Sequence, residues 1–239
     1  MEKLIVSTSP HLRSTTTTQT VMRDVLIALL PATVASVVLF GIKAAFIVLA
    51  CVASAVLAEA LFCIINKRPQ TVGDLSAAVT GLLLALNLPA TVSVWQCVVG
   101  SIFAIVIVKC VFGGIGRNFA NPAITARVFL VISFTSTIGG GAVPRLSSAP
   151  ELVSGATPLE IMKGEDIVGL PSLLDMLLGN RGGAIGETCA IALIVGGVYL
   201  IVRRVINWHT PVIFIGTVFV LSLIFKQDLT AALYQVLGG

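Results

Sequence analysis

A glycine-rich segment, FGGIGRNFANP at 112–122, has residue types suited to binding a flat polar ligand. Glycines let the backbone approach a ligand closely, and the N–H groups of such a turn can hold anions or carbonyls. Asparagine amides supply both donors and acceptors. Asn121 is equally suited to cap a helix beginning at Pro122, so capping stays open as the alternative. The candidate binding residues are Gly113, Gly114, Asn118 and Asn121.

A second segment, SGATPL at 154–159, carries a hydroxyl between small neighbours. Thr157 could simply cap a short helix starting at Pro158. A threonine hydroxyl on an exposed turn is also what a covalent phosphoester to a cofactor requires. The residues alone leave both roles open, with capping as the default.

Acidic residues that open apolar stretches are candidates for an ion path. Asp74 and Glu187 each follow a glycine at the start of such a stretch. The helix dipole favours an acid there, so capping is the default role, but carboxylates are also suitable ligands for hard cations. Glu187 is the first choice, because it directly follows the loop that carries Thr157. Asp24 and Glu59 are expected to snorkel or to pair with Arg23 or Lys67.

The composition identifies lipid as the natural solvent of most of the chain. Hydrophobic residues make up 56% of the 239 residues, charged residues 11%, and the mean hydropathy is +1.04. Soluble domains carry about 25% charged residues. The five cysteines form no CxxC pair, and no nucleotide-binding loop or hydrolase motif is present. These numbers exclude a disulfide scaffold and a nucleic-acid partner.

The hydropathy pattern predicts an all-α, polytopic membrane helical bundle with short or broken helices, forming one membrane domain over 1–239. About 20 apolar residues cross a bilayer. The Asn87-Leu88-Pro89 sequence divides the longest uncharged stretch. The predicted spans are 25–42, 44–65, 73–87, 91–112, 121–138, 186–203 and 209–226.

Lysine and arginine positions predict the orientation and the division of the domain. With the N-terminus in the cytoplasm, the inner segments hold more Lys and Arg than the outer ones, as the positive-inside rule requires. The chain then divides into a tail at 1–24, first spans over 25–138, an outer loop at 139–184 and further spans over 185–239. Because the last residues look like an element cut short, the chain is expected to lack its natural C-terminus.

Several blocks of the sequence resemble one membrane flavoprotein family. They are LIVSTSPHLRS, MRDVLIALLPA, GDLSAAVTGLLLALNLP, FGGIGRNFANPA, SGATPLE, GAIGETCAIALIVGGVYLI and FIGTVF, in this order. The chain is similar to the RnfD proteins of Rnf electron transport complexes and, more distantly, to the NqrB proteins of the sodium-pumping NADH:quinone reductase.

The resemblance implies a covalent FMN, attached through a phosphoester to Thr157 by a separate flavin transferase. Ser154, Gly155 and Ala156 would shape its turn. It also implies a non-covalent riboflavin, which we place near the glycine-rich segment. The expected role is a redox subunit of a plasma-membrane complex in a bacterium or archaeon, coupling electron transfer between ferredoxin and NAD to sodium or proton movement. Its partners would be other Rnf subunits, including an outer flavin subunit, and membrane lipid.

A solute transporter is the alternative function. The family resembles urea-channel-type proteins built from inverted repeats, and a broken span is typical of such folds. The segments that begin at Gly73 and Gly186 share a Gly-acid-small-apolar pattern. A transporter without a redox cofactor would carry no flavin after denaturation.

Overall fold

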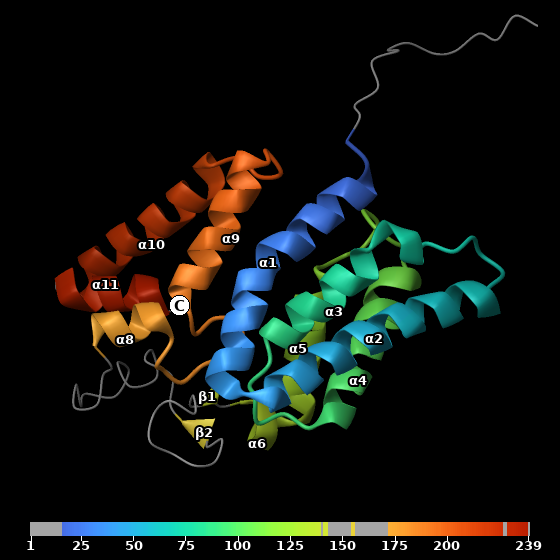
Figure 1. The fold of residues 1–239 in the computed structure, drawn as a ribbon, viewed down its shortest axis with the longest axis horizontal. Helices are drawn as coiled ribbons and strands as arrows, with labels where there is room; N and C mark the ends of the chain where they lie inside the picture. Colours follow the sequence, from blue (N-terminus) through green and yellow to red (C-terminus); the bar gives the residue numbers. More distant parts are fainter. Residues whose placement is uncertain (1–15, 140, 143–153, 156–171, 227–228, 239) are drawn as a thin grey trace, which may run out of the picture.

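The computed structural model describes residues 16–139, 141–142, 154–155, 172–226 and 229–238. Its secondary structure is helical apart from two strands of two residues each (Figure 1). The helices pack through apolar side chains, and apolar side chains also cover much of their outer surface. The prediction of an all-α membrane helical bundle is therefore confirmed.

Two long antiparallel helices, α1 (Thr18–Phe40) and α2 (Ile42–Ile65), form one side of the bundle. Thr17 and Thr20 form a capping box that starts α1. Helix α1 thus begins before the span predicted over 25–42. Gly41 separates the helices with φ 75° and ψ −163°, a conformation essentially reserved for glycine.

The third predicted span is a half-helix. A 3₁₀ turn, η1 (Val72–Asp74), leads through Leu75 into α3 (Ser76–Leu86), which ends before Pro89. Proline cannot continue the hydrogen-bond ladder, and the residue before it avoids helical geometry. α3 is 11 residues long, or about 16 Å, and so reaches only about halfway across a bilayer.

Two helical segments follow α3, and each of them is interrupted. α4 (Val94–Ile102) continues directly into the π-helix η2 (Phe103–Cys110). α5 (Pro122–Ser133) follows the glycine-rich segment and gives way at Phe134 to α6 (Thr135–Ile138). The predicted spans at 91–112 and 121–138 are thus helical but interrupted.

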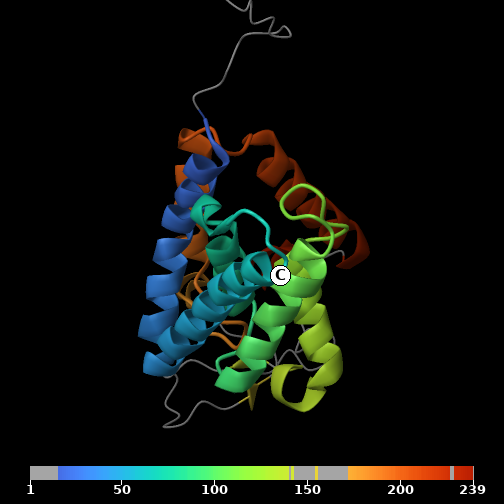
Figure 2. The same ribbon diagram turned by 90° about the vertical axis from the view of Figure 1, so that its right-hand side faces the viewer.

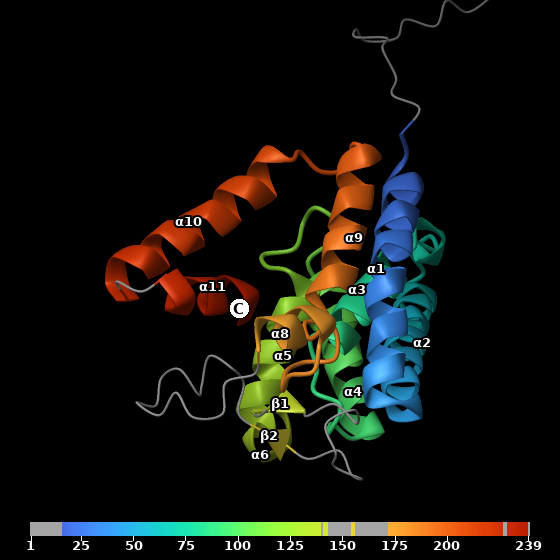
Figure 3. The same cartoon turned by 60° about the vertical axis from the view of Figure 1, so that its left-hand side comes forward.

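The remaining elements cover the α1 side of the bundle. Strands β1 (Gly141–Ala142) and β2 (Ser154–Gly155) pair antiparallel, with Gly141 opposite Gly155. Helix α9 packs along α1. Helices α10 and α11, in contrast, extend away from the group formed by α2, α3 and α4 (Figures 1 and 3). The bounds of these last helices are α8 (Leu173–Leu178), α9 (Ala190–Val202), α10 (His209–Lys226) and α11 (Leu229–Gly238).

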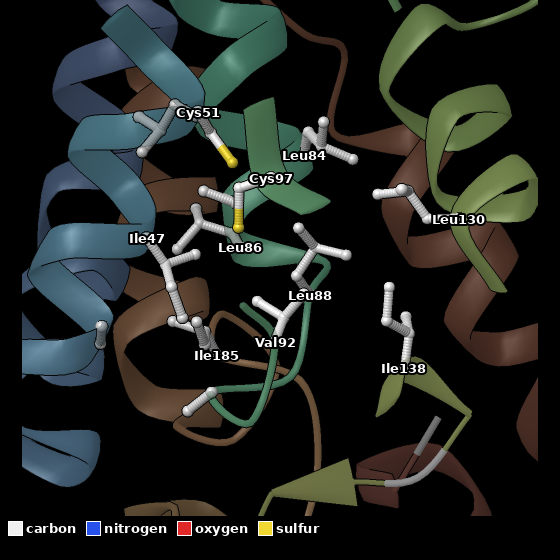
Figure 4. Close-up of a cluster of buried hydrophobic side chains, with 14 of the residues drawn as sticks. Ile47, Cys51, Leu84, Leu86, Leu88, Val92, Cys97, Leu130, Ile138 and Ile185 are labelled. Atoms are coloured by element: carbon white, nitrogen blue, oxygen red, sulfur yellow. The ribbon is translucent and has the colours of Figure 1, made fainter. Parts of the chain in front are cut away.

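The main apolar core lies where α2, α3, α4 and α5 meet (Figures 2 and 4). Leu84 from α3, Leu88 just after its end, Ile47 from α2 and Leu130 from α5 are fully buried in it. Cys51 and Cys97 lie in the same core, and the described cysteines are free thiols. The core thus encloses the break after α3.

Helix length separates two candidate spans from the others. α1 and α2 are long and apolar enough to cross a membrane, with mean hydropathies of 1.9 and 2.5. Five further apolar helices have 10–17 residues, so they do not qualify by length. The seven predicted spans therefore correspond to two full-length helices and five shorter ones.

Candidate functional site

A buried ion pair lies near the end of the bundle where α1 begins. Lys109 Nζ donates to Glu59 Oε1 over 2.8 Å, and the two side chains are 2% and 1% exposed. Thr71 Oγ1 donates to the same oxygen over 2.6 Å. The other carboxylate oxygen, Oε2, is buried and has no hydrogen-bond partner within the described residues. A buried charge is costly unless it is paired. The unpartnered oxygen is therefore suited to bind a further cation or a proton.

The ion pair is connected to a second acid through a serine. Lys109 Nζ also donates to Ser76 Oγ over 2.5 Å. Ser76 Oγ in turn donates to Asp74 Oδ1 over 2.6 Å, and the Ser76 amide donates to the same oxygen over 2.9 Å. One lysine therefore links the carboxylates of Glu59 and Asp74, and the predicted ion-path residue Asp74 lies in this cluster.

Local backbone irregularities position these side chains. Lys109 lies in the π-helix η2, whose wider turn shifts side chains relative to an α-helix and is frequent at functional sites. Leu75 adopts φ 65°, a left-handed conformation that is unusual for a leucine. This residue turns the chain from Asp74 into α3 and sets Ser76 at the start of the half-helix.

A cavity of about 360 Å³ adjoins the cluster. That volume is at the lower end of the range for small-molecule sites. Gly113 and Gly114 have φ of 108° and 94°, which only glycine adopts readily. The structure thus brings the predicted Gly113, Gly114 and Asp74 together with an ion pair that was not predicted. The cavity is lined by Thr18, Glu59, Thr71, Asp74, Lys109, Gly113, Gly114 and Ile115.

The two predicted asparagines differ in what they contact. Asn121 caps α5, with its Oδ1 accepting from the amides of Ala123 (3.0 Å) and Ile124 (3.4 Å). The capping alternative is therefore observed for this residue. Asn118 Oδ1 is buried without a hydrogen-bond partner within the described residues. A carbonyl oxygen in this state fits a ligand that donates an N–H. Neither asparagine lines the 360 Å³ cavity.

The predicted flavin turn is described only in part. Ser154 and Gly155 form β2, while Ala156 and Thr157 lie outside the described residues. β2 pairs with β1, and Ala142 of β1 exchanges two backbone hydrogen bonds of 3.1 Å with Gly183. Strand β2 is therefore connected through β1 to the segment that precedes α9.

Glu187 lies in a tight turn near the C-terminal end of α3. Its Oε1 accepts from the Ala184 amide over 3.1 Å. Arg181 is 5% exposed and donates to the carbonyl oxygens of Glu187 (2.6 Å) and Thr188 (3.4 Å). Burial lowers the pKa of Arg181, and the negative charge of Glu187 opposes this shift. Glu187 thus stabilises its own turn, and it lies at the other end of α3 from Asp74.

Two expected ion pairs were wrong. Glu59 pairs with Lys109 and not with Lys67. Asp24 is 5% exposed and contacts Arg203 at 3.1 Å, joining α1 to α9, instead of pairing with its neighbour Arg23. Sequence reasoning missed the role of Lys109, although an isolated lysine between apolar residues is a signal that it requires a partner.

The fold and this site define a helical membrane protein with a charged cluster inside its apolar bundle. The NQR2, RnfD, RnfE family matches residues 5–239. The chain belongs to this family.

Three relatives are each named as the D subunit of a complex. The chain is 44% identical to the D subunit of the Na⁺-translocating ferredoxin:NAD⁺ oxidoreductase complex of Acetobacterium woodii, over 99% of this chain and 73% of the relative. It is 38% identical to the D subunit of the proton-translocating ferredoxin:NAD⁺ oxidoreductase complex of Clostridium ljungdahlii, over 91% and 68%. It is 35% identical to the D subunit of the ion-translocating oxidoreductase complex of Halorhodospira halophila, over 90% and 69%.

Proposed function

We propose that this chain is a membrane flavoprotein subunit of an Rnf-type complex that couples electron transfer between ferredoxin and NAD to sodium or proton translocation. The observation that carries the proposal is the similarity over nearly the whole chain to relatives with that name. Since the sequence has no dehydrogenase motif, hydride transfer belongs to another subunit. The chain is therefore not catalytic alone.

Two flavins are part of the proposal. FMN is bound covalently to Thr157, in the turn begun by Ser154, Gly155 and Ala156, after attachment by a flavin transferase. Riboflavin binds near the glycine-rich segment, where the unpartnered Asn118 Oδ1 accepts an N–H and the backbone at Gly113 and Gly114 permits close approach. Bound flavins would supply transfer of one or two electrons. The chain's own residues bind and orient them.

The proposed ion path uses acids at the two ends of α3. Asp74 lies at the N-terminal end beside the Glu59–Lys109 pair, and Glu187 lies at the C-terminal end. Glu59 Oε2, which has no hydrogen-bond partner among the described residues, provides an oxygen for a cation or a proton. Lys109 balances the charge of the cluster, so a bound ion would not leave an isolated carboxylate in the apolar interior.

The proposed location is the plasma membrane of a bacterium or archaeon, with a cytoplasmic N-terminus and the flavin loop outside. Lys67, Arg68, Arg117 and Arg204 lie in the connections between helices, in segments that the charge pattern assigns to the inner side. Positive charge gathers on the cytoplasmic side of membrane proteins. On the outer side, another flavin-bearing subunit would exchange electrons with the FMN.

Mass spectrometry of the peptide that contains Thr157 tests the function. In cells with the transferase, we expect the peptide to carry the mass of FMN less one water. Thr157→Ala should abolish the modification, whereas Thr157→Ser, which keeps a hydroxyl, should retain at least part of it. An unmodified wild-type peptide and no flavin fluorescence after denaturing electrophoresis would instead favour the urea-channel-like transporter.

A further inference from the structure

Helix α9 ends in a turn whose left-handed residue is an arginine. Arg204 N donates to Ile201 O over 3.0 Å, and Val205 N donates to Leu200 O over 2.9 Å. These two hydrogen bonds form a Schellman motif, in which the residue after the C-cap is left-handed and usually a glycine. Arg204 takes this position with φ 56°. A side chain is unfavourable at such a φ, and the attraction of its charge to the helix C-terminus offsets only part of the cost.

Helix α2 ends in the same way. Lys67 has φ 50°, its N–H donates to Ile64 O over 3.2 Å, and Arg68 N donates to Cys63 O over 2.9 Å. By contrast, α8, in the segment predicted to face outward, ends at Gly179 with φ 94°. A basic residue thus replaces the favoured glycine at two helix ends that the charge pattern assigns to the inner side.

The guanidinium of Arg204 is available to bind a ligand. Its neighbour Arg203 is engaged by Asp24 at 3.1 Å. Arg204 itself is exposed and makes no ion pair or side-chain hydrogen bond within the described part of the chain. The sequence has no acidic residue between Glu187 and Asp228. The turn after α9 therefore presents a positive charge that the described neighbours do not compensate.

Apolar side chains are exposed on both sides of Arg204. Val202 is 73%, Ile206 37% and Trp208 54% exposed. The Trp208 ring stacks on His209, with 3.8 Å between the ring centroids. Tryptophan is enriched at membrane–water interfaces, because its ring is apolar and its N–H is polar. The connection between α9 and α10 thus combines apolar surface with a free cation, beside the first turns of α1 (Figure 3).

A phospholipid matches this combination of groups. An arginine can bind a phosphate through two parallel hydrogen bonds, and acyl chains cover exposed apolar side chains. A soluble nucleotide or an acidic peptide would leave Val202 and Ile206 in water. We infer that Arg204 binds the phosphate of an anionic phospholipid headgroup at the cytoplasmic surface of the membrane, with Trp208 against the glycerol region. This inference rests on the membrane location in the proposed function.

Photo-crosslinking in the assembled complex tests the site. The complex is placed in phosphatidylcholine nanodiscs that contain a small fraction of photoactivatable phosphatidylglycerol. Trypsin releases the peptide 205–226, or 204–226 when residue 204 is not basic, and mass spectrometry measures its labelling. We expect Arg204→Gly to lower this labelling about fivefold, the contribution of one basic residue at a membrane surface. Arg204→Lys should retain most of it, and labelling by photoactivatable phosphatidylcholine should not change.

Thermal unfolding in detergent without anionic lipid separates binding from folding. Because glycine suits the left-handed position, Arg204→Gly should unfold at the wild-type temperature or above it. A purely structural role of Arg204 would not combine a retained midpoint with a loss of labelling. The matched control is Arg23→Gln, which removes the same charge from an exposed position on α1 and should keep wild-type labelling.

Three results would overturn the inference. The first is equal phosphatidylglycerol labelling in Arg204→Gly and the wild type. The second is an equal loss in Arg204→Gly and Arg23→Gln, which would indicate diffuse attraction to the basic side. The third is competition by inorganic phosphate, but not by chloride of the same ionic strength, which would assign the site to a soluble anion.

Two further provisions keep the test decisive. If Arg204→Gly does not assemble, Arg204→Asn is measured with the same outcomes, because asparagine tolerates the left-handed conformation. The labelling requires neither flavin nor ion movement. A complex without covalent FMN that still shows labelling dependent on Arg204 would therefore contradict the proposed function and support the lipid site.

Discussion

Glu59 and Lys109 meet inside the apolar bundle although they lie 50 residues apart in the chain. Each compensates the desolvation of the other, and Thr71 and Ser76 satisfy further hydrogen bonds. Such a pair contributes little net stability compared with an apolar contact, but it is strongly destabilising to break.

Removing both partners should cost less than the sum of the two single removals. Lys109→Met leaves Glu59 buried and unpaired, so we expect the free energy of unfolding to fall by about 3–5 kcal/mol. Glu59→Gln combined with Lys109→Met should lose less than the sum of the single changes, because no buried charge remains. Thermal unfolding of the four proteins in detergent measures this coupling. Strictly additive losses would mean that the two groups do not compensate each other.

Asn121 allows helix capping to be separated from ligand binding. Asn121→Ser keeps an N-cap oxygen and should leave stability nearly unchanged, whereas Asn121→Leu should cost about 1 kcal/mol. If the amide also binds riboflavin, the flavin released by acid should fall in both variants. Full riboflavin occupancy in Asn121→Ser would assign Asn121 to the cap alone.

At the scale of elements, breaks in helices create the candidate site. α3 stops at Asn87, η2 widens to a π-helix, and η1 ends in the left-handed Leu75. Each break places a polar side chain or a helix end inside the bundle, where neighbouring segments satisfy its hydrogen bonds. Irregular backbone at membrane depth is tolerated only under this condition.

The junction of α1 and α2 depends on the backbone of Gly41. A Cβ is strained at φ 75° and ψ −163°, so we expect Gly41→Ala to cost about 1–3 kcal/mol. Gly197→Ala, inside α9 with open space around it, should be neutral or slightly stabilising. Comparing unfolding midpoints of the two variants in the same detergent checks the prediction. Equal midpoints would show that the α1–α2 junction rearranges without cost.

At the scale of the whole molecule, α3 lies between two acids and contacts both halves of the chain. Its N-terminal end holds the cluster of Asp74, and its C-terminal end receives the segment that leads into Glu187 and α9. α9 is itself attached to α1 through Arg203 and Asp24. The segment 183–186 and the ion pair therefore contact opposite ends of the same half-helix.

Glu187→Gln tests whether this second acid belongs to the ion path. In proteoliposomes, we expect electron transfer to persist while ion uptake falls, because the variant keeps the shape of the side chain and loses its charge. Asp175→Asn, at a side chain on the short exterior helix α8, is the matched control and should transport normally. Unchanged transport per electron in Glu187→Gln would mean that Glu187 only stabilises its turn through the hydrogen bond from the Ala184 amide.

Local features of the sequence are enough to predict the class of fold and the places where its helices break. The apolar composition and the length of the apolar stretches predict a membrane bundle. The Asn87-Leu88-Pro89 sequence predicts where the half-helix ends. Both predictions succeed because hydropathy and proline geometry are local properties of the sequence. Gly113 and Gly114 were also identifiable, because their left-handed backbone requires glycine. The family resemblance was also evident from the sequence alone, because it is carried by short blocks of residues such as FGGIGRNFANPA and SGATPLE.

Which charges meet, in contrast, depends on the tertiary structure. Lys67 is near Glu59 in the sequence, but it follows the end of α2, whereas the π-helix turns Lys109 toward the interior from a different element. The docking of 183–186 on the end of α3 was equally hidden, since backbone hydrogen bonds between distant segments leave no pattern in the local sequence. Pairing of buried groups depends on which helices pack together, and that is set by the whole bundle.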